Sequence, residues 1–249
     1  MESAGRVVAL NHVGISVADL DAARRFWIGG LSAHEHGAFG WPVGTAPADE
    51  SLATEGTSAE VVLLRTDAAF MELFAFGSPT PGVRSPGSPG VKGLVWAAVD
   101  PDATYAQAVD AGGTPSGERR VRCPDGTPVT VVASDGPTGL VGVLVQVPDA
   151  EAHALPTVPG PVAVEVSGGA DEPRARPVDL GVNHLCLDVT DIDGVREKVA
   201  GTTWHHDVTE SSGGIAAVCY GTTSDGVLVE LLESRTPDAF LSRTRLAYP

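Results

Sequence analysis

Two histidine–glutamate pairs, one near each end of the chain, have the side chains needed to bind a metal ion. His12 lies in the segment NHVGISVADLD, and His184 lies in the related segment NHLCLDVTDID. Each segment is followed later by an alternating apolar run with a single carboxylate, Glu72 in FMELF and Glu230 in LVELL. Imidazole and carboxylate groups are suitable ligands for Ni, Co, Mn, Zn or Fe. The matched pairs therefore predict the two halves of one four-ligand site for a divalent metal.

The charge and surroundings of these side chains favour that interpretation. Two neutral imidazoles and two carboxylates neutralise a divalent cation, and four protein ligands leave octahedral positions open for substrate oxygens. Glu72 stands among Phe70, Leu73 and Phe74, where an unpaired buried carboxylate costs on the order of several kcal/mol. A cation removes that cost. A glutamate beside such an ion can also act as a base, so Glu72 and Glu230 are the candidate catalytic residues.

The residues around the two pairs predict the elements that position them. Residues 6–17 alternate, so that His12 faces away from Val13, Ile15 and Val17, as on a half-buried strand. A helix is expected after the N-cap Asp19, as it is after its counterpart in the last part of the chain. Both ends of the chain therefore predict a β-α-β-β-β unit. The remaining strands are expected near 31–40, 59–66 and 68–76 in the first unit, and near 181–189, 203–210, 214–222 and 226–233 in the last.

The chain between the two ends predicts a third unit that has lost its ligands. Its expected strands and helix follow the same order, but Leu94 or Trp96 stands at the histidine position and Thr130 or Gln146 at the glutamate position. Proline- and glycine-rich segments on either side are expected to be linkers. The predicted division is a first unit at 1–76, a linker at 77–91, an inserted unit at 92–147, a linker at 148–178 and a last unit at 179–249.

A tandem of such units, with a histidine on the first strand and a glutamate on the fourth, resembles the vicinal oxygen chelate superfamily. This group includes glyoxalase I, methylmalonyl-CoA epimerase, extradiol dioxygenases and bleomycin resistance proteins. The similarity is carried by LNHVGISVADLDAARRFW and by RPVDLGVNHLCLDVTDID with YGTTSDGVLVELLES. It implies an α+β fold in which two units form a cupped open barrel around one divalent metal, here held by His12, Glu72, His184 and Glu230.

The resemblance leaves open which units pair. The outer units can pair with each other, with the third unit inserted between them. Alternatively, units pair in chain order and the last one pairs across a homodimer. Ligand content favours the first arrangement, because only the outer units carry both a histidine and a glutamate.

The expected function is that of a metal-dependent lyase, isomerase or epimerase that acts on a small oxygenated metabolite through a chelated enolate or enediolate. An iron(II) extradiol-type dioxygenase is the first alternative, although that chemistry typically uses two histidines and one carboxylate. A non-enzymatic drug-binding or resistance protein is the second, although such binders commonly lack the ligands. Fold analogy alone does not choose between them.

Composition and net charge limit the classes of binding partner and the cellular location that are expected. The net charge of −16 argues against nucleic acid and anionic membranes as partners. Without an apolar run long enough to span a membrane or an N-terminal signal pattern, a cytoplasmic protein is expected. The three cysteines lack the spacing of a disulfide scaffold or a thiolate zinc site, and Cys186 is expected at most to line the pocket. The expected surface or rim residues are His34, His36, His205 and His206, whereas Tyr220 on the penultimate strand is placed where it could reach the cup.

Overall fold

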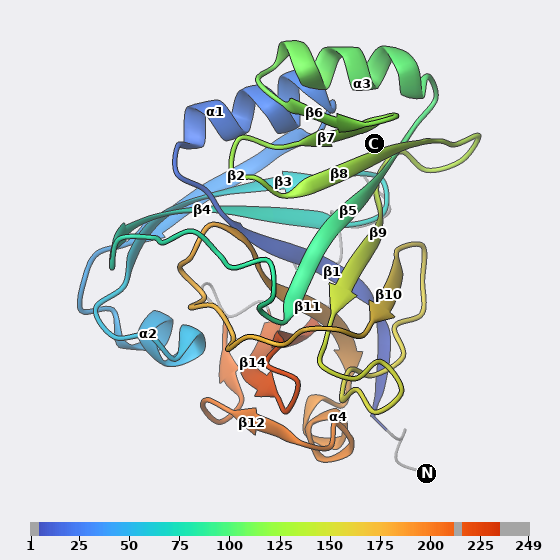
Figure 1. Cartoon of the computed structure of the whole chain (residues 1–249). Coiled ribbons are helices and arrows are strands. Elements are labelled where there is room, and N and C mark those ends of the chain that lie inside the picture. The colour runs from blue at the N-terminus through green and yellow to red at the C-terminus, as the bar shows by residue number, and fades with distance from the viewer. Residues whose placement is uncertain (1–4, 212–215, 235–249) are drawn as a thin grey trace.

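The chain is an α+β structure built on two open, multi-stranded sheets, as a computed structural model shows for residues 5–211 and 216–234 (Figure 1). The expected fold class is therefore confirmed. Within the described residues, no helix is long and apolar enough to cross a membrane.

The first unit has the predicted order of elements. Asp19 caps the first helix, since its side chain accepts hydrogen bonds from the backbone N–H groups of Asp21 and Ala22. An additional short helix interrupts the loop between the second and third strands. The elements are β1 (Arg6–Ser16), α1 (Leu20–Arg24) continuing as the π-helix η1 (Arg25–Gly30), β2 (His34–Trp41), α2 (Ala46–Leu52), β3 (Ser58–Arg65) and β4 (Phe70–Ser78).

The last unit repeats that order. Asp191 caps its helix by accepting a hydrogen bond from the N–H of Gly194. The strand expected near 203–210 is divided into two short pieces. The elements are β11 (Gly181–Thr190), α4 (Ile192–Lys198), β12 (Thr202–Trp204), β13 (Thr209–Glu210), β14 (Ala216–Thr223) and β15 (Leu228–Ser234).

These two units share one sheet, because their first strands pair with each other. The strand order is β12-β14-β15-β11-β1-β4-β3-β2, in which β1 and β11 run antiparallel at the centre. Each first strand also lies parallel to the fourth strand of its own unit, β1 beside β4 and β11 beside β15. The outer units therefore pair within one chain.

The chain between them forms the second sheet. Its order is β10-β9-β5-β8-β7-β6, and the part β5-β8-β7-β6 repeats the arrangement β1-β4-β3-β2. Strand β9 does not close the inserted unit but pairs antiparallel with β5, as β11 pairs with β1. The elements are β5 (Gly90–Ala98), α3 (Pro101–Asp110), β6 (Thr114–Gly117), β7 (Arg120–Arg122), β8 (Pro128–Ala133), β9 (Gly139–Gln146) and β10 (Ala163–Ser167).

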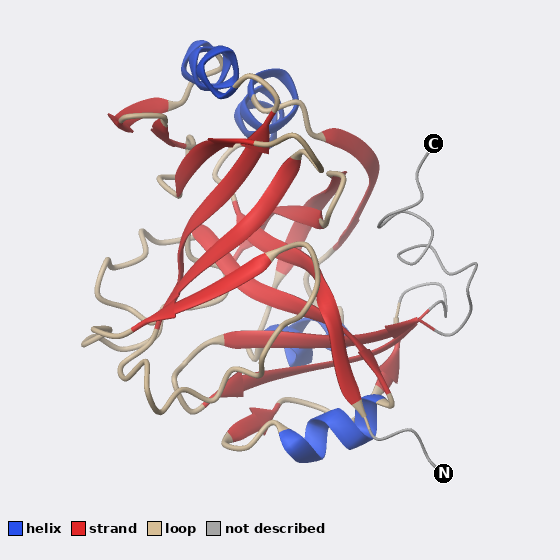
Figure 2. Cartoon of the chain, turned by 90° about the vertical axis from the view of Figure 1, so that its right-hand side faces the viewer, coloured by secondary structure: helices blue, strands red, loops and turns tan. Residues whose placement is uncertain are grey.

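The inserted part packs against the first unit through an aromatic core. Phe26 and Trp27 on η1 are fully buried, and the ring of Trp27 lies 5.7 Å from that of Trp96 on β5. Helices α1 and α3 lie together at one end of the molecule, whereas α4 lies at the opposite end (Figures 1 and 2). This packing fixes the second sheet beside the strands that carry the histidine–glutamate pairs.

Candidate metal centre

The four sequence-predicted ligands converge on one face of the central strands. β1 carries His12 and β11 carries His184, and their Nε2 atoms lie 3.1 Å apart. Glu230 Oε2 lies 3.1 Å from His12 Nε2 and 3.4 Å from His184 Nε2. Glu72 Oε2 lies 3.4 Å from His12 Nε2. Residues far apart in sequence thus form one compact cluster with His12 at its centre.

Strand register explains why the cluster forms. Gly14 on β1 lies opposite His184 on β11 and, on its other side, opposite Glu72 on β4. His12 lies opposite Cys186, which is itself beside Glu230 on β15. Side chains at these positions point to the same side of the sheet because strand residues alternate. The arrangement also requires a glycine, since a Cβ at Gly14 would overlap the imidazole of His184.

The amide of Asn11 fixes the tautomer of His12. Its Nδ2 group donates to Asp188 Oδ1 at 3.0 Å, so its Oδ1 must be the atom that faces His12 Nδ1, also at 3.0 Å. Since a carbonyl oxygen only accepts, His12 Nδ1 carries the proton. In the neutral ring, the Nε2 atom of His12 therefore presents a lone pair to the cluster.

In the last unit, Asn183 orients His184 in the same way, through a different set of hydrogen bonds. Ser16 donates its hydroxyl proton to the carbonyl of Pro177 and accepts from Nδ2 of Asn183, at 2.9 and 3.0 Å. Asn183 Oδ1 then accepts from His184 Nδ1 at 2.7 Å. Each asparagine thus reaches across to the other unit, and in each neutral histidine the proton is held on Nδ1. Such outer contacts orient metal-binding histidines in proteins.

The result is a buried pocket in which acceptor atoms of four side chains are crowded together. Two imidazole lone pairs and two carboxylates face one another, and Glu230 Oε2 is enclosed without accepting a hydrogen bond from any group in the described part of the chain. Lone pairs at about 3 Å repel unless a cation lies between them. The donor set therefore fits a divalent transition metal.

The pKa values of His12 and Glu230 are shifted by the other groups of the same cluster. Burial alone would lower the pKa of His12, but Cys186, Glu72 and Glu230 outweigh burial, and the pKa is raised well above its ordinary value. Burial would raise the pKa of Glu230, but His12 and His184 lower it below its usual range. Both shifts show that the pocket stabilises positive charge strongly.

Two further side chains belong to this site, and sequence reasoning gave them at most a marginal place. Cys186 was expected at most to line the pocket, and it is fully buried against His12 and Glu230. Tyr220 on β14 lies opposite Glu230, with its ring 5.6 Å from that of His184. Burial, Glu230 and Glu72 raise its pKa well above the ordinary value, so it stays protonated as a hydrogen-bond donor.

The other candidate histidines do not join the cluster. His205 Nδ1 contacts the carbonyl of Ser51 at 2.8 Å, and its Nε2 contacts the hydroxyl of Thr222 at 2.9 Å. The ring of His206 lies 6.1 Å from that of Tyr220, at the border of the site. His34 is exposed on β2, and His36 on the same strand lies against Phe70. These residues have structural or border positions.

The second sheet has the same register, but it lacks both histidines and one of the two glutamates. Counting back from the helix caps Asp19 and Asp100 places Gly93 at the position of His12, so the expectation of Leu94 or Trp96 there is wrong. Thr130 lies opposite Val95 as Glu72 lies opposite Gly14, as expected. On β9 and β10 the corresponding residues are Gly142 and Glu165. A shallow depression there is lined by residues that include Lys92 and Arg120.

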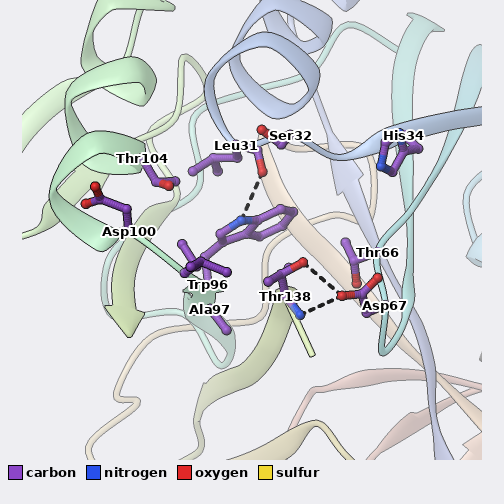
Figure 3. Close-up of a pocket in the computed structure, with 13 residues that line it drawn as sticks. Leu31, Ser32, His34, Thr66, Asp67, Trp96, Ala97, Asp100, Thr104 and Thr138 are labelled. Carbon is purple, nitrogen blue, oxygen red and sulfur yellow. Dashed lines mark hydrogen bonds between the residues drawn. The ribbon is translucent and has the colours of Figure 1, made fainter. Parts of the chain in front are cut away.

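A separate pocket lies at the seam between the first unit and the second sheet (Figure 3). Trp96 Nε1 donates there to the carbonyl of Leu31 at 3.1 Å, and Thr138 donates to Asp67 through both its N–H and its hydroxyl. The polar groups drawn in these contacts already have partners, and none of the four clustered residues lines the pocket. Its position and its contacts indicate a packing seam, so the candidate site remains the histidine–glutamate cluster.

Replacement of Asn11 tests the outer contacts. In Asn11→Leu, His12 Nδ1 loses its acceptor, so the ring loses its fixed tautomer and orientation. We expect affinity for a divalent cation to fall about 10–100-fold, as measured by calorimetric titration. Thr57→Val, which removes a buried hydroxyl bound to Asp49, is the control and should leave metal affinity unchanged. Equal affinities for Asn11→Leu and the parent protein would contradict the assigned role.

Comparison with known proteins supports the fold described above. The chain has the fold of the vicinal oxygen chelate superfamily, which confirms the resemblance at that level. Glyoxalase I from Zea mays aligns with a TM-score of 0.67 and 12% identity, over 92% of this chain and 93% of that one. No family model matches the sequence, and no curated protein matches it.

Two other solved structures are similar over nearly the whole chain. A putative dioxygenase from Bacillus subtilis has a TM-score of 0.66 at 10% identity, covering 98% of this chain and 91% of that one. The cppA protein from Streptococcus pneumoniae has a TM-score of 0.59 at 11% identity, covering 92% and 98%. Because one fold carries several chemistries at such low identity, these likenesses establish architecture alone.

Proposed function

We propose that the protein is a metal-dependent, glyoxalase-like lyase, isomerase or epimerase that acts on a small oxygenated metabolite. One observation carries the proposal: two imidazoles and two carboxylates converge through contacts of 3.1–3.4 Å around His12. A divalent cation held there by His12, Glu72, His184 and Glu230 would polarise substrate oxygens as a Lewis acid.

The two carboxylates have different surroundings, which assigns them different roles. Glu230 contacts both histidines, and its side chain is 5% exposed. Glu72 contacts only His12 among the ligands and is 14% exposed. Glu230 is therefore the anchored carboxylate, and Glu72 is the one that can turn toward a substrate. We assign Glu72 as the base that removes a proton from the carbon beside a carbonyl and returns it to a neighbouring atom.

The walls of the site contribute binding and exclusion of water. The rings of Phe74 and Tyr220 lie 5.9 and 5.6 Å from that of His184. An apolar wall strengthens the electrostatic interactions of the carboxylates with a bound substrate. The protonated hydroxyl of Tyr220 supplies a donor for a substrate oxygen. A compact molecule with adjacent oxygens fits this combination better than an extended polymer does.

Separate substitutions of the two glutamates test this assignment. Glu72→Gln keeps an oxygen ligand but removes the base, so we expect retained metal and a loss of solvent-deuterium exchange of about 100-fold or more. Glu230→Gln removes the anchored charge and should mainly weaken metal binding. The measurements are metal content and deuterium incorporation into a candidate α-hydroxycarbonyl or 2-oxo substrate, followed by mass spectrometry.

The same samples distinguish the alternatives. Stoichiometric consumption of dioxygen by the iron-loaded protein would replace the isomerase assignment with the extradiol-type dioxygenase. Tight binding of a drug by metal-free protein, without turnover, would favour a binding or resistance protein. If both glutamine variants keep full exchange activity, the proposed role of the carboxylates is wrong.

A further inference from the structure

We propose that Cys186 is a fifth protein ligand of this centre, bound as a thiolate, and the proposal rests on the metal-dependent function above. Cys186 is fully buried on β11, two residues after His184. Its sulfur and the nearest ligand atoms of His12 and Glu230 all lie within 4.8 Å of one another. A second set with the same spacing consists of His12, Glu72 and His184. The two sets share His12.

Comparison of the two repeated units shows that only the last one carries a thiol at this position. Cys186 occupies in the last unit the position that Gly14 occupies in the first, because each stands two residues after its histidine. Across the β1–β11 pair, Gly14 faces His184 and Cys186 faces His12. A side chain at Gly14 would collide with His184. On the opposite side, the cysteine occupies the corresponding space beside His12 and brings a potential ligand into the cluster.

A second observation indicates that an ion belongs at that position. Glu230 Oε2, in a residue only 4% exposed, accepts no hydrogen bond from the described residues although His12 Nε2 lies 3.1 Å away. In a neutral His12, whose proton Asn11 holds on Nδ1, that contact joins two acceptors. An ion between His12, Glu230 and Cys186 would satisfy the orphaned oxygen. The thiol proton would leave to solvent as the sulfur binds, as occurs for coordinating thiols.

A Cys186 thiolate in the cluster would allow Glu72, the assigned base, to leave the metal. His12, His184, Glu230 and a Cys186 thiolate make a four-ligand set with two negative charges. That set neutralises a divalent ion without Glu72, so Glu72 can leave to act on substrate while the charge balance is kept. The sulfur also makes the centre softer, which favours Zn and Co over Mn.

The competing explanation is that Cys186 only fills space. It packs beside an apolar group that includes Phe70 and Leu232, and buried cysteines are often small hydrophobic residues. The two explanations differ in one measurable property, the presence of sulfur in the coordination shell.

X-ray absorption of the zinc-loaded, full-length protein tests the proposal. We expect a sulfur shell at about 2.3 Å in addition to nitrogen and oxygen at about 2.0–2.2 Å. The cobalt-loaded protein should also show a near-ultraviolet thiolate charge-transfer band. Cys186→Ala should lose both signals and bind zinc at least about tenfold more weakly. Mutation of residues that only hydrogen-bond to metal ligands already lowers metal affinity about 10–100-fold. Cys123→Ala, which removes a buried thiol of the second sheet, should keep both signals.

The outcomes separate this proposal from the proposed function. A parent protein that binds zinc through nitrogen and oxygen alone would overturn the role of Cys186 and leave the metal-dependent function standing. A parent protein that binds neither zinc nor cobalt would overturn both. If Cys186→Ala does not fold, the spectrum of the parent protein still decides the question, because the sulfur shell is either present or absent there.

Discussion

Replacement of His12 with alanine is expected to abolish stoichiometric binding of a divalent cation. His12 Nε2 contacts His184, Glu72 and Glu230 at 3.1–3.4 Å, so its loss removes the group shared by the whole cluster. In the parent protein, free metal at about 100 times Kd should add about 2.7 kcal/mol of stability, which raises Tm by roughly 5–10 °C for a chain of this size. His12→Ala should show no rise.

Scanning calorimetry with zinc or with a chelator measures this effect. His205→Ala is the matched control, because both ring nitrogens of His205 already contact protein groups away from the cluster. It should keep the full metal-dependent rise in Tm. An undiminished rise in His12→Ala would show that the cation binds elsewhere.

The second large effect is expected from Gly14→Ala. The added methyl group would overlap the His184 ring and the Asn183 amide, both buried. Overpacking of this kind typically costs about 1–3 kcal/mol, and displacement of His184 should also remove most of the affinity for metal. Denaturant unfolding and metal titration measure the two effects separately.

Gly37→Ala on β2 provides the comparison, since a Cβ there meets no atom within 4 Å. It should change neither the free energy of unfolding nor metal affinity by an appreciable amount. If Gly14→Ala binds metal as the parent protein does, the close approach of β1 to His184 is not essential to the site.

Sequence reasoning succeeded where local pattern decides structure. The period-two alternation around His12 and the caps Asp19 and Asp191 are visible in short segments, and the structure has strands and helices there. The repeat added the matched glutamates, and the structure brings these four candidate ligands together. These features depend on residues close in sequence or on a direct comparison of two segments.

Features that depend on strand register were harder to predict. β5 carries irregularities between Val91 and Gly93 and between Val95 and Trp96, so counting alternate residues from a guessed start misplaced the histidine position. The closeness of Cys186 to His12 follows from the β1–β11 pairing, which joins residues far apart in sequence. Alignment of the two repeat segments is the sequence observation that could have predicted this position, because it aligns Cys186 with Gly14 on the face that carries the ligands.

The central pairing of β1 with β11 also determines when the site can form. The two histidines are separated by 172 positions, so β1 has no β11 partner until the chain has been synthesised as far as Thr190. Closing such a distance carries an entropic term that grows only logarithmically with length, but long-range strand pairing is slow. The second sheet joins strands much nearer in sequence, and we expect it to fold earlier. Metal uptake would then mark the last step of folding, when both ends of the chain have met.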